Sequence, residues 1–170
     1  MAIKKKGIAR WVTFILFLTC ADQLIKLIIY HNYMAHTFPI IENFISFTPH
    51  FNEDISWFNA KYDLNMGLGI ITLLTIAVLI FALYQAKIHY MEYQEQTLAV
   101  AGYSTFISGV LASVLDKILW GTSLDYIKFR NWFIFDLKDL YLDLGSLLFM
   151  IGYIIFEVKK HKALGQEVKG

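Results

Sequence analysis

Long apolar stretches alternate with shorter polar segments along most of the chain. Four of the apolar stretches are long enough to cross a bilayer, which takes about 20 mostly apolar residues; they cover residues 11–30, 64–86, 97–115 and 140–156. The second and third stretches contain no Asp, Glu, Lys or Arg. This pattern predicts an all-α membrane protein with four transmembrane helices, arranged as a single membrane domain over residues 1–170.

The polar segments between these stretches have a character of their own. Residues 38–41 and 44–48 are rich in β-branched and aromatic side chains and are joined at 42–43, which predicts two short strands. Residues 125–138 mix aromatic side chains with charges, a composition typical of an amphipathic segment that lies among lipid headgroups. We therefore expect a small β-element and an interfacial amphipathic segment beside the four helices.

Composition agrees with a membrane location and excludes several other classes. The chain is 57% hydrophobic and 17% charged, whereas about a quarter of a soluble domain is usually charged. Its formal net charge of +1 gives no reason to expect a nucleic-acid partner. Cys20 is the only cysteine, so a disulfide within the chain and a zinc site built from cysteines are both excluded.

Lys and Arg residues indicate the orientation. They gather in the N-terminal tail and in the tail after the last apolar stretch, which places both tails in the cytoplasm by the positive-inside rule. Residues 31–63 and 116–139 then lie on the outer side. The second of these outer segments contains four basic residues against the rule: Lys117, Lys128, Arg130 and Lys138. This exception suggests that the segment is functional.

Carboxylates cluster near the outer ends of the third and fourth stretches. Five aspartates lie there: Asp116, Asp125, Asp136, Asp139 and Asp143. One alternative is simple solvation of the helix ends, because an aspartate at a helix N-terminus is favoured by the helix dipole. The other is chemical. Two close carboxylates cannot both ionise easily, so one holds a proton while the other acts as a base, and such a pair can activate water for peptide hydrolysis.

Two further pairs have helical spacing. Asp22 and Lys26 lie in the first stretch at i and i+4, which predicts a buried ion pair, since ionisable groups at membrane depth usually face the protein interior. Ser113 and Lys117 have the same spacing, so a serine–lysine hydrolase pair is geometrically possible.

Five short blocks carry a resemblance to a known family. They are Asp22-Gln23-Leu24-Ile25-Lys26, the apolar residues 38–45, residues 50–57 with Asn52 and Trp57, residues 109–117 followed by 124–127, and residues 135–139 followed by Gly145. In this order and spacing the chain resembles bacterial signal peptidase II, the lipoprotein signal peptidase, from about residue 11 to residue 156.

The matches and the departures both bear on activity. Asp116 and Asp125 keep the spacing of two family aspartates, and Asp139 and Gly145 also match. Several family positions hold other residues: Asp54, Ile55 and Ser56 replace Gly-Ala-Ala, Ser113 and Asp136 replace asparagines, Lys117 replaces arginine and Lys138 replaces alanine. The resemblance implies that Asp125 and Asp139 are the catalytic pair, with Lys138 beside them as an added cation.

The resemblance implies an intramembrane aspartyl endopeptidase of the bacterial cytoplasmic (inner) membrane, with its active site near the extracytoplasmic face. Its partners would be diacylglyceryl-modified prolipoproteins, whose signal peptides it removes, and membrane lipids; no metal or cofactor is implied, and a monomer is expected. The residues implied to bind substrate or support the site are Asp22, Lys26, Asn52, Ser113, Asp116, Lys117 and Asp136. Two alternatives stay open: a non-catalytic homologue that binds lipid-modified or hydrophobic peptides, and a small transporter or channel subunit.

Overall fold

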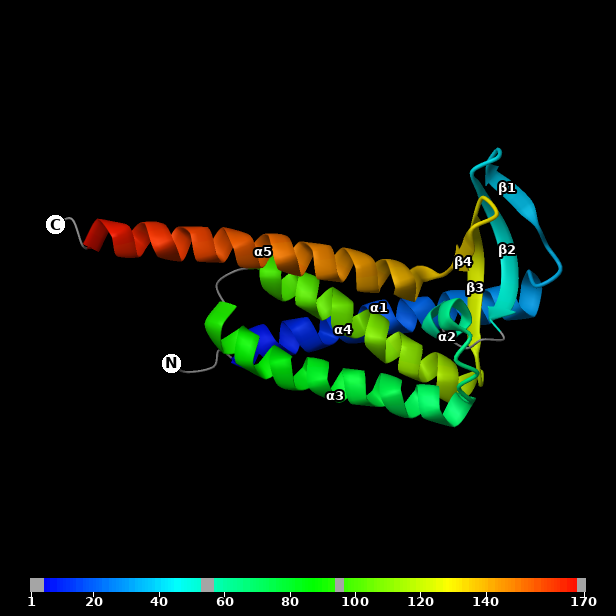
Figure 1. The fold of residues 1–170 in the computed structure, drawn as a ribbon, viewed down its shortest axis with the longest axis horizontal. Helices are drawn as coiled ribbons and strands as arrows, with labels where there is room; N and C mark the ends of the chain where they lie inside the picture. The colour runs from blue at the N-terminus through cyan, green and yellow to red at the C-terminus, as the bar shows by residue number, and fades with distance from the viewer. Residues whose placement is uncertain (1–4, 53–56, 94–96, 168–170) are drawn as a thin grey trace.

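Long helices run side by side, and a small sheet closes one end of them (Figure 1). The computed structural model describes residues 5–52, 57–93 and 97–167. The helices are α1 (Lys5–Asn32), the short α2 (Trp57–Tyr62), α3 (Leu68–Tyr93), α4 (Thr97–Leu119) and α5 (Leu137–Glu167). The first turns of α1 and the last turns of α5 lie at the end opposite the sheet (Figure 1).

The four predicted transmembrane helices are confirmed by length and composition, in α1, α3, α4 and α5. Their ends differ from the predicted ones. Helix α3 starts at Leu68 rather than at 64, since the Asn59 side chain bonds both backbone groups of Met66 and holds the preceding turn. Helix α4 continues to Leu119, and α5 already begins at Leu137. Several residues expected in an outer segment therefore belong to helices.

The sheet is antiparallel with the order β1-β2-β3-β4. Its strands are β1 (Phe38–Ile41), β2 (Ile45–Asn52), β3 (Ser123–Phe129) and β4 (Phe133–Phe135). Strands β1 and β2 confirm the two predicted strands. Residues 125–138, predicted as an interfacial amphipathic segment, instead supply most of β3, all of β4 and the first two residues of α5. The physical reason is pairing with β2, which places Phe129 opposite Ile45 and Asp125 opposite His50.

Helices α4 and α5 approach each other at glycines. A Cβ atom added at Gly152 would lie 2.5 Å from the backbone nitrogen of Ala99, and one added at Gly145 or Gly102 would also meet backbone atoms of the facing helix. Small residues at helix contacts are a usual means of close packing in membranes. The glycine that matched the family pattern, Gly145, thus has a packing role.

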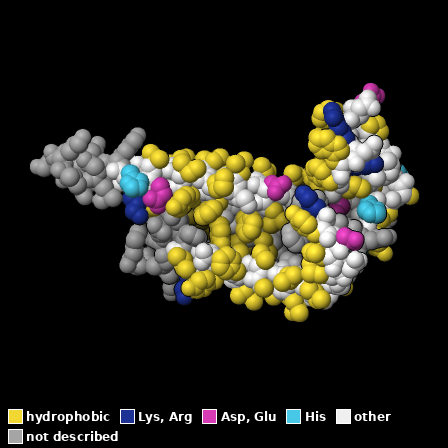
Figure 2. Space-filling view, in the orientation of Figure 1, with side chains coloured by type: hydrophobic (Ala, Val, Ile, Leu, Met, Phe, Trp, Pro, Cys, Tyr) yellow, Lys and Arg dark blue, Asp and Glu magenta, His cyan; other side chains and the backbone are white. Residues whose placement is uncertain are grey.

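The other faces of the helices carry apolar side chains outward. Figure 2 shows apolar side chains over the long helices of one face of the molecule. Large examples are Phe17 on α1, Leu73 on α3 and Ile154 on α5, all more than half exposed. Exposed apolar surface of this extent is expected where lipid surrounds a protein.

Candidate active site

A cluster of buried charges lies where α1, α4, β3 and α5 meet near the sheet. Lys26 is the largest completely buried side chain among the described residues, and Asp22, Asp116 and Asp136 are also completely buried. Burying an unpaired charge costs several kcal/mol, so each of these groups needs a partner. Their contacts define the site.

Lys26 supplies the first buried cation and contacts three carboxylates. Its Nζ lies 2.9 Å from Asp22 Oδ2, 2.6 Å from Asp116 Oδ2 and 2.6 Å from Asp136 Oδ2. The predicted Lys26–Asp22 pair is confirmed. The contacts with Asp116 and Asp136 join α1 to α4 and to the start of α5, which the local spacing along α1 could not reveal.

Lys138 supplies the second buried cation. Its Nζ donates to Asp136 Oδ2 at 2.6 Å and to Ser123 Oγ at 2.7 Å. It also lies 3.4 Å from Asp125 Oδ1 and 3.8 Å from Asp139 Oδ1. The ammonium group of Lys138 therefore lies beside both carboxylates of the implied catalytic pair.

The aspartates implied to be catalytic come close together from different elements. Carboxylate oxygens of Asp125, Asp136 and Asp139 lie within 4.8 Å of one another. Asp125, on β3, is buried and accepts hydrogen bonds from Ser123 Oγ at 2.8 Å and from Asn52 Nδ2 at 3.1 Å. The side chain of Asp139 is 39% exposed. One carboxylate is thus enclosed, and the other is open to an incoming molecule.

A reciprocal pair of hydrogen bonds positions Asp139. The backbone N–H of Asp139 donates to Asp136 Oδ1, and the backbone N–H of Asp136 donates to Asp139 Oδ2, both at 3.2 Å. This is the geometry of a capping box, in which the N-cap and N3 side chains satisfy each other's backbone donors. Asp136 therefore starts α5 and, by doing so, fixes Asp139 in its first turn.

Gln23, Trp120 and Ser123 support the cluster and were not among the predicted site residues. Gln23 Nε2 donates to Asp22 Oδ2 at 3.0 Å and to Asp116 Oδ1 at 2.8 Å, while Trp120 Nε1 donates to Gln23 Oε1 at 3.1 Å. Ser123 Oγ links Asp116 and Asp125. The motif that contains Asp22 and Lys26 also includes Gln23, so Gln23 could have been predicted as a site residue from that motif.

Other predicted residues lie at the edge of this cluster or outside it. Lys117 Nζ donates to Ser113 Oγ at 2.9 Å and to Ser113 O at 3.2 Å, so the two form a pair along α4. Asp143 is exposed on α5 and no described group forms a hydrogen bond or ion pair with it. Three of the substituted family positions, Asp54, Ile55 and Ser56, lie outside the described residues.

The two lysines govern the charge state of Asp136. Burial alone would raise the pKa of Asp136, but Lys138 and Lys26 outweigh burial and hold that pKa below its ordinary value. Asp136 therefore stays ionised and accepts from both ammonium groups. Burial and the nearby carboxylates Asp136 and Asp22 raise the pKa of Tyr126 well above its usual range, so its hydroxyl stays neutral.

The carboxylates of Asp125, Asp136 and Asp139 lie close enough together to hold a metal ion. The ammonium group of Lys138, however, already lies among them. The Nζ atom of Lys138 lies within 3.8 Å of an oxygen of Asp125, Asp136 and Asp139. The ammonium group compensates the charge that a divalent ion would otherwise neutralise.

Comparison with known proteins places this arrangement in a family. A family model described as signal peptidase (SPase) II matches residues 14–155. The chain belongs to the signal peptidase II family. Membership implies a protease, and together with the four apolar helices it identifies a bacterial membrane protein.

Two lipoprotein signal peptidases match over nearly their whole length. The lipoprotein signal peptidase of Fusobacterium nucleatum is 25% identical over 157 residues, covering 88% of this chain and 89% of that protein. That of Streptococcus pneumoniae is 27% identical over 164 residues, covering 92% and 98%. A solved bacterial membrane enzyme has the same fold, with a TM-score of 0.72 at 23% identity over 90% of this chain and 92% of the other.

Proposed function

We propose that this protein is an aspartyl endopeptidase that removes signal peptides from diacylglyceryl-modified prolipoproteins, with Asp125 and Asp139 as its catalytic pair. The observation that carries the proposal is the approach of these two carboxylates to within 4.8 Å from separate elements, one enclosed and one open. Both are also the aspartates that the family pattern implies. No cofactor enters the proposed reaction.

The two carboxylates would share the proton transfers of peptide hydrolysis. Asp125 accepts hydrogen bonds from three donors, on Ser123, Asn52 and Lys138. These contacts suit an ionised carboxylate, which can only accept hydrogen bonds. Asp125 would take a proton from a water molecule while the oxygen of that water attacks the scissile carbonyl carbon. Asp139 would give a proton to the leaving amine nitrogen as the carbon–nitrogen bond breaks. The products are a signal peptide with a new carboxyl terminus and a lipoprotein with a free amino group on its modified cysteine.

The architecture supports a substrate that approaches from the bilayer. Asp125 lies on β3 and Asp139 in the first turn of α5, at the sheet end of the helices (Figure 1), and the long helices carry many exposed apolar side chains. In the proposed topology the sheet is extracytoplasmic and both tails are cytoplasmic. Aromatic residues of the sheet would contact the lipid-modified part of the substrate.

The decisive experiment is incubation of the purified protein with a lipid-modified prolipoprotein, followed as a gel shift. Asp125→Asn and Asp139→Asn should each lower the cleavage rate by on the order of 10² to 10⁴ while substrate binding persists. Asp143→Asn is the matched control, because Asp143 lies on α5 close in sequence to Asp139 but is exposed. Its rate should stay within about twofold of the wild type.

Two results would contradict the proposal. Binding of the prolipoprotein by the wild type without any cleavage would identify a non-catalytic homologue. Full activity in either dyad variant would remove that aspartate from the mechanism.

A further inference from the structure

The structure accounts for two of the four basic residues that break the positive-inside rule and leaves two unexplained. Lys117 and Lys138 are buried beside the carboxylate cluster. Lys128 and Arg130 instead lie on the β3–β4 hairpin, where Lys128 is half-buried and Arg130 is exposed. Within residues 5–52, 57–93 and 97–167, neither forms a salt bridge with a carboxylate. Their charge remains available to a ligand.

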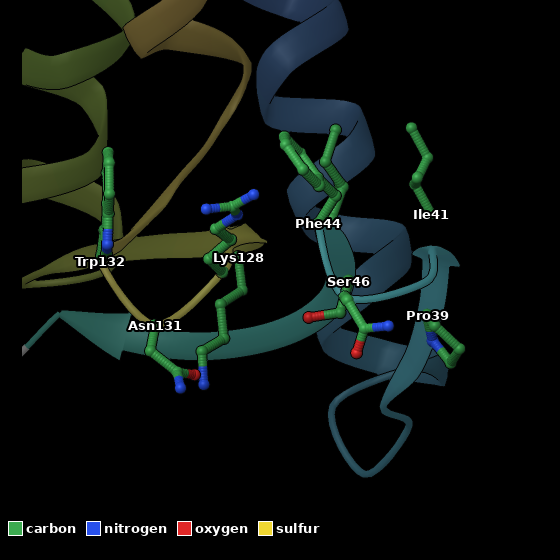
Figure 3. A pocket seen from close by; sticks show the side chains of 10 residues that line it. Pro39, Ile41, Phe44, Ser46, Lys128, Asn131 and Trp132 are labelled. Atoms are coloured by element: carbon green, nitrogen blue, oxygen red, sulfur yellow. The ribbon is translucent and has the colours of Figure 1, made fainter.

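Both residues line a cleft between the two hairpins of the sheet. The cleft, here called the hairpin cleft, has a volume of about 610 Å³ and is lined by residues of the β1–β2 and β3–β4 hairpins (Figure 3). Its polar lining includes Lys128, Arg130, Asn43 and Asn131, and none of the described residues that line it is acidic. Glu42 lies in the same turn as Asn43 but does not line the cleft. The hairpin cleft is therefore a cationic site with amide donors.

Contacts between the hairpins hold Arg130 in place. Its guanidinium carbon lies 4.1 Å from the centroid of the Phe44 ring, a cation–π distance. Its backbone N–H donates to Phe44 O at 2.9 Å, and its backbone adopts a positive φ of 48°. Stacking on the ring face leaves the N–H groups at the edge of the guanidinium able to donate to an anion.

Large apolar side chains surround the cationic part of the cleft. Trp132 is 74% exposed, Ile41 is 54% exposed and Phe44 is 44% exposed, and all three line the cleft. Aromatic residues at such positions are enriched at membrane–water interfaces. A ligand that satisfies both parts needs a phosphate for the cations and an apolar body for the rim, which a free inorganic anion lacks.

We propose that the hairpin cleft binds the phosphate of an anionic phospholipid, with Lys128 and Arg130 as its cationic contacts and Trp132 and Ile41 against the glycerol and acyl region. A net-negative headgroup is favoured over a zwitterionic one, because the described lining of the cleft offers no carboxylate to pair with a headgroup amine. The site is separate from the carboxylate cluster and does not depend on peptide hydrolysis. It anchors the sheet at the headgroup layer beside the mouth of the active site.

The test measures lipid binding in the absence of prolipoprotein, by native mass spectrometry of the detergent-solubilised protein. Phosphatidylglycerol and phosphatidylcholine are titrated separately into the wild type and into the double variant Lys128→Gln/Arg130→Gln. A basic residue near an anionic membrane surface contributes about 1 kcal/mol, so the double variant should lose roughly tenfold to thirtyfold in affinity for phosphatidylglycerol. Its affinity for phosphatidylcholine should not change.

Matched variants separate this site from general charge attraction and from misfolding. Lys87→Gln/Lys159→Gln removes two exposed cations from α3 and α5 and should keep the wild-type affinity. Lys128→Arg/Arg130→Lys preserves the charge and should also retain binding. Equal losses in the two glutamine double variants, or no preference for phosphatidylglycerol in the wild type, would overturn the proposal. Displacement of the lipid by millimolar inorganic phosphate would identify a free-anion site and would overturn it as well.

Discussion

The contacts of Lys26 allow a quantitative prediction for Lys26→Met. This change removes the cation shared by Asp22, Asp116 and Asp136, whose oxygens lie 2.6–2.9 Å from Nζ. Breaking a buried ion pair by deleting one partner typically costs about 3–5 kcal/mol, since the remaining charge is left uncompensated. Of the three carboxylates, Asp116 and Asp136 keep a contact with Lys138, at 3.5 Å and 2.6 Å. We therefore expect a loss of about 3–5 kcal/mol and not a multiple of it.

A double-mutant cycle with Asp22→Asn tests the reasoning. The asparagine side chain can still accept the hydrogen bond that the backbone N–H of Lys138 donates to Asp22 Oδ1 at 3.1 Å. Asp22→Asn alone should therefore cost less than Lys26→Met. In Lys26→Met/Asp22→Asn one uncompensated carboxylate is gone, so the double variant should recover about 1–2 kcal/mol relative to the sum of the single changes. The recovery is partial because two other carboxylates still face the missing ammonium group.

The assay is thermal or denaturant unfolding in one detergent, with Lys159→Met as the control because Lys159 is exposed on α5. The control should unfold like the wild type. Strict additivity of the Lys26 and Asp22 changes would show that the pair contributes no coupling. A wild-type melting temperature for Lys26→Met would show that the buried cation does not stabilise the fold.

Three further predictions concern the helix contact, the added charges and acid stability. Gly145→Ala should lower the melting temperature markedly, because its Cβ would meet the backbone of Phe106, whereas Gly69→Ala, with no atom within 4 Å of its Cβ, should be neutral. Asp136→Asn alone should destabilise the protein, because two buried lysines lose a carboxylate, and adding Lys138→Ala should restore part of the loss; a melt of each variant checks this. Because the pKa of Asp136 is lowered on folding, its contribution to stability is complete above its ordinary value of 3.8 and is lost only as pH falls towards the lowered pKa. Melting curves from pH 7 to pH 3 should therefore show the difference between wild type and Asp136→Asn constant above pH 5 and shrinking in acid.

The sequence predicted those parts of the fold that depend on local pattern. Four apolar stretches identified the long helices, and β-branched and aromatic residues identified β1 and β2. Strands β3 and β4 were not predicted, because they depend on pairing between distant parts of the chain. In β3, Ile127 pairs with Phe47 and Phe129 pairs with Ile45, and local composition cannot indicate such pairing. The start of α5 was placed too late, since Asp136 and Asp139 form a capping box with aspartate where serine or threonine and glutamate are usual.

The sequence predicted which charged residues lie close together better than it predicted their contacts; their roles in catalysis stay a prediction. Motif order predicted that Asp125 and Asp139 form a pair, and they do lie close together; helical spacing predicted the Lys26–Asp22 ion pair. The same spacing could not show that Asp116 and Asp136 also contact Lys26, because those contacts depend on how α1 packs against α4 and α5. The sequence marked Lys138 only as a departure from the family pattern. Its position beside Asp125 and Asp139 depends on how β3 and the start of α5 pack together.

The shared contacts of Lys26 also have a consequence for the order in which the protein is made. Helix α1 is synthesised first, and Asp116 follows Lys26 by 90 residues, which at about 5–20 residues per second is a delay of roughly 5–20 seconds. A lone lysine at the centre of an inserting helix costs about 2.5–3.5 kcal/mol, and Lys26, which lies six residues before the end of its span, should cost less than this. During that delay Asp22, one helical turn away, is the counter-ion that the nascent helix carries with it. We therefore expect the local pair to lower the cost of inserting α1, before Asp116 and Asp136 reach Lys26 with α4 and α5.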